Sequence, residues 1–187
     1  MNQVTEREIP AVDKRGERRE RLRDFQSQLL ERMQAARTSD VVSSNQLGVM
    51  IGDTRYLLNL RDAGEIVSVG QISEVPLTRA WYLGLLNLRG NLIGVIDIQH
   101  FQGRPKVNLD SDCRIIAFSS GLAFNAGLLV SKVLGLRNVA EMSVEQHATD
   151  SQHAWQKQTY VDSSDQVWLE LSLANLIQDS DFLHIGL

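Results

Sequence analysis

Residues 81–98, WYLGLLNLRGNLIGVIDI, are the stretch that decides the fold of this 187-residue chain. Both flanks of the stretch are almost wholly apolar, and Arg89-Gly90-Asn91 interrupts them in the middle. Apolar and β-branched flanks around a glycine turn predict a β-hairpin, with arms at about 83–88 and 92–98. The arginine at its tip is open to three interpretations: a turn residue, a catalytic group or a contact point for another protein.

The rest of the chain repeats the pattern of strand, short turn and strand. Candidate strands lie at 47–51, 56–60, 65–69, 115–118, 124–130, 160–161 and 167–171. Many short strands with few long helices indicate a mainly β protein of the β-barrel class. Between the strands we expect a helical turn at 78–81, a long polar connection at 141–158, and a short C-terminal helix that begins at 173–177.

Apolar positions also repeat at long range. Residues 60–66 align with residues 130–136 at an offset of 70, weakly in identity but well in the rhythm of apolar positions. This offset predicts two similar β lobes within one compact domain.

The first 43 residues differ in character from the rest of the chain. Residues 1–16 are polar and without pattern, which is typical of disorder. Leu22, Phe25 and Met33 recur at helical spacing, so we expect an amphipathic helix over about 17–37. Its apolar stripe could pack on its own domain or dock to a partner or a second copy. We therefore divide the chain into an N-terminal extension, 1–43, and a β domain, 44–187.

Charge and composition limit the classes of function. Residues 1–37 carry nine Lys/Arg and seven Asp/Glu, whereas the remainder carries ten and sixteen. A body with this acidic excess repels phosphate groups, which argues against nucleic-acid binding. The sequence begins without an apolar signal segment and has no uninterrupted apolar run of membrane-spanning length. We therefore expect a cytoplasmic protein without direct membrane insertion.

The residue types that carry catalysis and metal binding show no recognisable arrangement. Phosphate-binding and nucleophile-elbow motifs are absent, and the four histidines and one cysteine lack the spacing of zinc ligands. Asp97 acting with a histidine is the one acid–base pair that could be considered. Cys113 lies beside an apolar run and is expected to be a buried thiol. The sequence thus predicts no catalytic residue, no metal ligand and no cofactor.

Glu65 and Arg89 are the other two charges that lie within strongly apolar sequence. Leaving either charge unpaired in an apolar setting costs several kcal/mol, so these two side chains could pair. An ion pair of this kind serves structure or recognition and is no evidence of an enzyme.

Several motifs, in order along the chain, resemble the CheW-like chemotaxis adaptor family. They are the strand that carries Glu65-Ile66, the segment Val75-Pro76, the hairpin at 81–98, the strand GLLVSKV at 127–133, and the closing segment 168–177. The resemblance runs from about residue 46 to residue 178. It implies two SH3-like small β-barrels packed side by side, with short helices.

The chain departs from the family pattern at three positions. Gly94 stands where the family usually has proline, Ser131 where it has aspartate, and Gly135 where it often has an acid. Glycine at position 94 is expected to make that arm of the hairpin looser than proline would.

The resemblance also implies a function. Members of the family are non-enzymatic adaptors that couple the cytoplasmic tip of a methyl-accepting chemoreceptor to a CheA-type histidine kinase. Such an adaptor passes on the signalling state of the receptor as a difference in affinity. The N-terminal helix and the tail at 182–187 resemble those members that control type IV pili and twitching motility. Flagellar chemotaxis or another chemosensory output is the alternative.

By the same resemblance, Glu65 and Arg89 match the paired acid and arginine near the receptor-facing and kinase-facing surfaces of the family. An arginine among apolar groups that exclude water is typical of an interaction hot spot. The apolar neighbours that complete the candidate protein-binding surface are Ile66, Val67, Leu86, Leu88, Gly90 and Ile93. Leu86, Leu88 and Ile93 could equally well be core residues.

Overall fold

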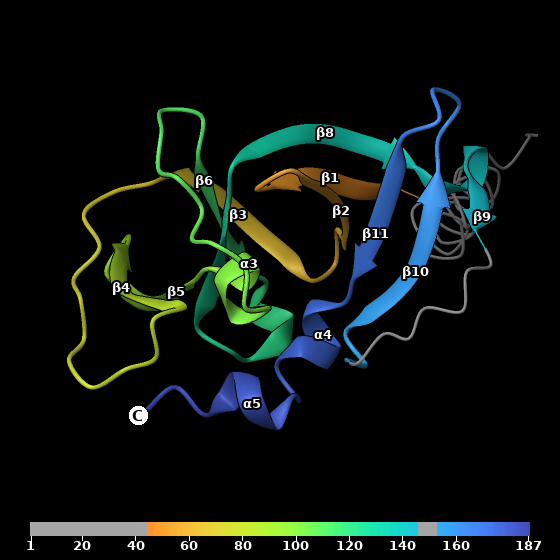
Figure 1. The fold of residues 1–187 in the computed structure, drawn as a ribbon. Coiled ribbons are helices and arrows are strands. Elements are labelled where there is room, and N and C mark those ends of the chain that lie inside the picture. The colour runs from red at the N-terminus through yellow and green to blue at the C-terminus, as the bar shows by residue number, and fades with distance from the viewer. Residues whose placement is uncertain (1–44, 146–152) are drawn as a thin grey trace, which may run out of the picture. The chain divides into compact units, whose positions relative to one another are not determined.

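The computed structural model describes residues 45–145 and 153–187. The N-terminal extension 1–43 and its expected helix at 17–37 lie outside the described residues, as does the middle of the polar connection at 141–158. The described part is mainly β, with two mixed sheets and short helices (Figure 1).

The first sheet has six strands. In spatial order these are β8 (Lys132–Asn138), β1 (Asn45–Ile51), β2 (Thr54–Asn59), β11 (Val167–Leu171), β10 (Gln156–Val161) and β9 (Ser143–Glu145). Strand β11 runs parallel to β2, and every other neighbouring pair is antiparallel.

The second sheet has five strands. In spatial order these are β3 (Ala63–Ser68), β6 (Arg114–Phe118), β7 (Ala126–Val130), β5 (Asn91–Ile96) and β4 (Tyr82–Leu88). Strand β5 runs parallel to β7, and the other pairs are antiparallel. The predicted hairpin is thus present as β4 and β5, although Asp97 already belongs to the start of a helix.

The two sheets share the same topology, and each contains one strand from the other repeat. Strands β1 and β2 form a hairpin, and β3 then crosses to pair with β6; strands β6 and β7 form a hairpin, and β8 then crosses to pair with β1. Strands β3 and β8 begin at residues 63 and 132, which is close to the offset of 70 seen in the sequence. The internal repeat predicted from apolar rhythm is therefore a repeat of topology.

The expected small barrels are not closed by backbone hydrogen bonds. Among the described residues, β3 and β4 remain edge strands of one sheet, and β8 and β9 remain edge strands of the other. The second sheet nevertheless curls far enough for Glu65 on the edge strand β3 to contact Arg89, which follows the opposite edge strand β4. Side chains rather than a backbone ladder connect these edges.

One apolar core serves both sheets. Val49 and Leu58 from the first sheet and Ile115 and Leu128 from the second have no exposed surface and belong to the same cluster. Strand β7 is buried along its whole length, as expected for an apolar strand with neighbours on both sides.

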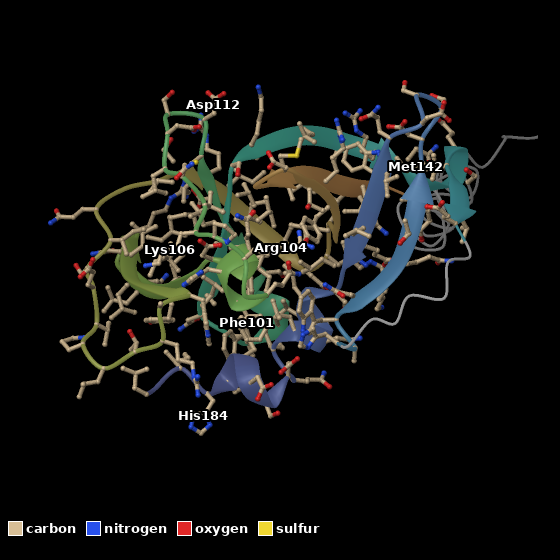
Figure 2. All side chains as sticks on the ribbon, in the orientation of Figure 1. Phe101, Arg104, Lys106, Asp112, Met142 and His184 are labelled. Atoms are coloured by element: carbon tan, nitrogen blue, oxygen red, sulfur yellow. The ribbon has the colours of Figure 1, made fainter. Side chains whose placement is uncertain are left out.

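Three four-residue helices cover one end of the core. These are α3 (Ile98–Phe101), α4 (Leu173–Leu176) and α5 (Ser180–Leu183). Phe101, labelled in Figure 2, is the last residue of α3, and its ring meets that of Phe182 in α5 edge-on at 5.8 Å between centroids. The expected C-terminal helix at 173–177 is therefore α4. No helix among the described residues is long and apolar enough to cross a membrane.

The helical turn expected at 78–81 is present only as one hydrogen-bonded turn, in which the amide of Tyr82 donates to the carbonyl of Arg79 at 2.9 Å, and no helix is formed there. Leu77 follows a proline and takes a left-handed φ of 60°. The next residues then hydrogen-bond to the C-terminal segment, with the amide of Arg79 donating to the carbonyl of Ile185 at 2.8 Å. A tertiary contact 106 positions away in the chain therefore overrides the local preference of this segment.

Candidate protein-binding surface

The tip of the β4–β5 hairpin is a two-residue turn made by Arg89 and Gly90. Leu88 pairs with Asn91 across the turn, and φ is 52° at Arg89 and 92° at Gly90. Two positive φ values in a two-residue loop define a type I′ turn, which matches the twist of the strands. The amide of Gly90 donates to the Asn87 side-chain oxygen at 2.8 Å. An arginine in the first position of this turn is unusual, since asparagine followed by glycine is the preferred pair.

Arg89 pairs with Glu65, as the sequence suggests, but at the surface. The Nη2 atom of Arg89 donates to Oε1 of Glu65 at 2.6 Å, and the two side chains are 79% and 38% exposed. Charges exposed to this degree form a pair worth no more than about 1 kcal/mol. The apolar enclosure that the flanking sequence suggested for them is wrong, because the turn and the edge strand place both groups outside the core. The pair is therefore accessible to a partner.

The apolar candidates divide between surface and core. Ile66 is 41% exposed on β3, and Val67 and Leu88 are half-buried. Leu86 and Ile93 are each only 6% exposed and belong to the core cluster. For these two residues, the interpretation as core is the one that the structure supports, since their side chains lack the exposure that a contact requires.

Leu92 is an exposed residue of this region that the sequence analysis did not single out. Its side chain is 57% exposed, and it pairs with Asn87 next to the turn. Strand alternation could have identified it, because a buried Ile93 requires Leu92 to point the other way. We define the hairpin-tip surface as Glu65, Ile66, Arg89, Gly90 and Leu92.

Asp97 is a structural residue of the hairpin's second arm. Its carboxylate is fully buried, with one oxygen accepting the amide of His100 at 3.1 Å and the other that of Val107 at 2.9 Å. Asp97 is thus the N-cap of α3 and also holds the loop that follows it. Since backbone amides engage both oxygens, the carboxylate is not placed to act as an acid or base with a histidine.

The remaining candidates for chemistry are also structural. The ring of His100 contacts the carbonyl of Arg104 at 2.8 Å, and His153 stacks on Trp155. In the described ranges 45–145 and 153–187, no group of three or more His, Cys, Asp or Glu side chains could hold a metal ion. Cys113 is 1% exposed, and burial raises the pKa of its thiol. The thiol therefore stays protonated and unreactive, as its apolar surroundings in the sequence predict.

Three comparisons with known proteins bear on identity. The chain is 24% identical to PilI of Pseudomonas aeruginosa over 152 aligned residues. The aligned region covers 81% of this chain and 85% of PilI. It is 25% identical over 89 residues to FrzA of Myxococcus xanthus, covering 48% of this chain and 55% of FrzA. The crystal structure of the scaffolding protein TtCheW from Thermoanaerobacter tengcongensis superposes with a TM-score of 0.59 at 25% identity. That superposition covers 70% of this chain and 89% of TtCheW.

The sequence profile of the CheW-like domain matches residues 46–181, a range that includes all but the first residue of the two sheets, the helices α3 and α4, and the start of α5. The chain therefore belongs to the CheW-like domain family and is a non-enzymatic scaffolding protein of chemosensory signalling.

Proposed function

We propose that this protein couples a methyl-accepting chemoreceptor to a CheA-type histidine kinase in the pathway that controls type IV pili and twitching motility. The observation that carries the proposal is the exposed ion pair of Glu65 and Arg89 beside exposed Ile66 and Leu92. Both charges are too exposed to serve the fold, and the surrounding apolar groups provide area that a partner can bury. The hairpin-tip surface is thus suited to a protein contact.

The pilus output is supported by the similarity to PilI, which extends over most of both chains. The similarity to FrzA favours a second candidate, another chemosensory output served by the same coupling. Deleting the gene in the native bacterium and measuring twitching zones and swimming rings separates the two. We expect loss of twitching with normal swimming; normal twitching would contradict the pilus assignment.

Charge variants of the hairpin-tip surface test the coupling itself. Arg89→Ala and Glu65→Lys are expected to fold normally and to lose at least about tenfold in affinity for kinase and receptor membranes, measured by co-sedimentation. Arg61→Ala is the matched control, because Arg61 is an exposed arginine of the turn between β2 and β3. It should bind like the wild type.

A charge-swapped double variant separates recognition from architecture. Glu65→Arg combined with Arg89→Glu keeps an ion pair between β3 and the turn but reverses its direction. If a partner recognises the individual charges, this variant stays folded and does not bind. If the swapped pair, or both single variants, bind like the wild type, the pair is only structural and the proposed surface is wrong.

A further inference from the structure

A pocket of about 480 Å³ lies where the segment before β4 meets α3 and α5. Pockets of this size are typical of small-molecule sites. We call it the Trp81 pocket, and its lining residues are Arg79, Trp81, Phe101, His153, Asp181 and His184. Trp81 comes just before β4, and the turn at Arg89 follows the other end of that strand, so the pocket is separate from the hairpin-tip surface.

Aromatic rings form the inner wall of the Trp81 pocket. Trp81 is buried, and the ring of Phe101, which is labelled in Figure 2, meets it edge-on at 5.1 Å between centroids. The imidazole of His153 lies 6.2 Å from the Phe101 ring and stacks on Trp155 at 5.0 Å. Because these contacts hold the rings in place, the wall is formed in advance and suits a flat aromatic group.

Arg79 lies exposed at the rim of the pocket and is held there by the segment that follows α5. Its amide donates to the carbonyl of Ile185 at 2.8 Å, and its Nε donates to the carbonyl of His184 at 2.9 Å. Within the described ranges, the two Nη groups of Arg79 have no acceptor. A guanidinium fixed in this way can present its remaining N–H donors to a carboxylate.

Asp181 provides the opposite charge at the same rim. Its backbone amide donates to Oδ1 of Asp179 at 2.9 Å, in the first turn of α5. Its own carboxylate accepts no hydrogen bond and forms no salt bridge within residues 45–145 and 153–187. This carboxylate is therefore free to accept from an ammonium group.

The two charges line one pocket but do not pair with each other. No salt bridge joins Arg79 to Asp181 in the part of the chain that the structure describes. A free cation and a free anion in one pocket favour a ligand that carries both charges. Together with the aromatic wall, they match the carboxylate, the ammonium and the ring of an aromatic α-amino acid.

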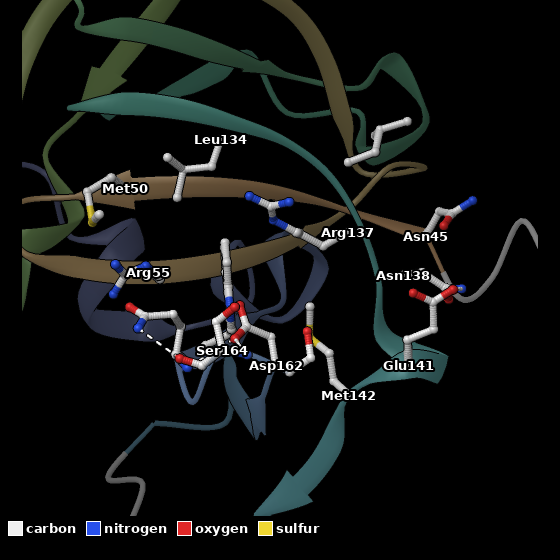
Figure 3. A pocket seen from close by; sticks show the side chains of 14 residues that line it. Asn45, Met50, Arg55, Leu134, Arg137, Asn138, Glu141, Met142, Asp162 and Ser164 are labelled. Carbon is white, nitrogen blue, oxygen red and sulfur yellow. Dashed lines mark hydrogen bonds between the residues drawn. The ribbon is translucent and has the colours of Figure 1, made fainter.

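The larger pocket on the first sheet does not offer this combination. It has a volume of about 670 Å³ and is lined by strands β1, β2 and β8 and by the β10–β11 turn, with Arg55 and Arg137 among its residues (Figure 3). Its acid Asp162 accepts the indole N–H of Trp168 at 2.9 Å and two backbone amides. Glu141 accepts a side-chain amide at 2.8 Å. Because both acids are already engaged, that pocket has no free carboxylate for an ammonium group.

We propose that the Trp81 pocket binds a free α-amino acid with an aromatic side chain. Its carboxylate accepts from the Nη groups of Arg79, its ammonium donates to Asp181, and its ring lies against Trp81 and Phe101. The proposal does not depend on whether the hairpin-tip surface couples receptor and kinase.

Matched ligands test which groups are recognised. The full-length protein is titrated, with its amide signals followed by NMR, using four compounds: L-phenylalanine; hydrocinnamate, which lacks the ammonium; phenethylamine, which lacks the carboxylate; and L-alanine, which lacks the ring. Since both charges lie at an exposed rim, we expect each missing charge to weaken binding about fivefold. L-alanine should bind at least about tenfold more weakly, because it buries no ring. No binding of L-phenylalanine, or equal binding of all four compounds, would overturn the proposal.

Variants of the protein assign each charge to its partner group. Asp181→Asn should weaken L-phenylalanine about fivefold without weakening hydrocinnamate, which has no ammonium to lose. Arg79→Gln should weaken L-phenylalanine to a similar degree without weakening phenethylamine. Asp53→Asn and Arg61→Gln make the same changes of charge in turns outside the pocket, so they should bind L-phenylalanine like the wild type.

Asp181→Asn is the variant that decides. Arg79→Gln also removes the hydrogen bond to His184, whereas the side chain of Asp181 makes no hydrogen bond or ion pair among the described residues. Near-UV circular dichroism checks that Asp181→Asn is folded. Unchanged binding of L-phenylalanine to the folded variant, or an equal loss for L-phenylalanine and hydrocinnamate, contradicts the proposal. A loss for L-phenylalanine alone supports it.

Discussion

Arg89 has an uncommon backbone conformation, and this bears on why an arginine is there. A non-glycine residue with φ near 52° is less stable than in the ordinary regions, and asparagine tolerates this conformation better than a long side chain does. The exposed ion pair to Glu65 offsets little of that cost. An unfavourable residue at an exposed turn is consistent with a contribution to binding rather than to folding.

The loss of stability that arises from the positive φ at position 89 can be measured with a matched pair of variants. Arg89→Asn and Arg89→Gln both remove the ion pair, so their difference reports the turn alone. We expect Arg89→Asn to be more stable than Arg89→Gln by about 0.5–1 kcal/mol, measured by urea unfolding. Equal stability, or a more stable glutamine variant, would contradict strain at this position.

Strand β5 shows why glycine suits position 94 in this chain. The amide of Gly94 donates to the carbonyl of Asn125 at 2.9 Å, a hydrogen bond that the family's usual proline could not make. A Cβ at this position would lie 2.8 Å from a ring carbon of Tyr82. The tyrosine ring thus occupies the space that a larger residue would need. That glycine makes this arm looser than proline would stays a prediction.

A double-mutant cycle measures this packing. Gly94→Ala should destabilise the protein by about 1–3 kcal/mol because the new methyl group meets the Tyr82 ring. In a Tyr82→Ala background the same substitution should cost clearly less, since the ring is gone. Urea unfolding of the four proteins gives the coupling energy. Equal costs in both backgrounds would show that the ring is not the obstacle.

At the scale of the whole molecule, the exchange of β3 and β8 makes each sheet depend on the other. Neither repeat can complete its own sheet, because each contributes its third strand to the partner sheet. The buried cluster is also continuous across both sheets. Strands and core that are shared in this way favour cooperative unfolding of the two sheets.

Core substitutions in either sheet should therefore shift a single unfolding transition that is common to both sheets. We expect Leu58→Ala in the first sheet and Leu128→Ala in the second each to cost about 2–5 kcal/mol. Tryptophan fluorescence and far-UV circular dichroism should give coincident urea curves for both variants. Lys157→Ala, an exposed substitution on β10, is the control and should change stability by less than about 0.5 kcal/mol. Separate transitions for the two sheets would contradict this account.

The sequence by itself determined most of what is local. The hairpin at 81–98, the strand pairs around it and the burial of Cys113 follow from apolar runs and glycine turns, which act over a few residues. The repeat at an offset of 70 and the resemblance to the CheW-like family were also visible in the sequence, and so was the pairing of Glu65 with Arg89.

Only the tertiary structure decided what depends on contacts between distant residues. It placed the ion pair at the surface, buried Leu86 and Ile93, and limited the helical turn expected at 78–81 to a single hydrogen-bonded turn. It also brought Arg55 and Arg137 to one pocket. Residues 82 positions apart in the chain meet only because β8 crosses to the sheet that contains β1 and β2, and no local pattern encodes that crossing.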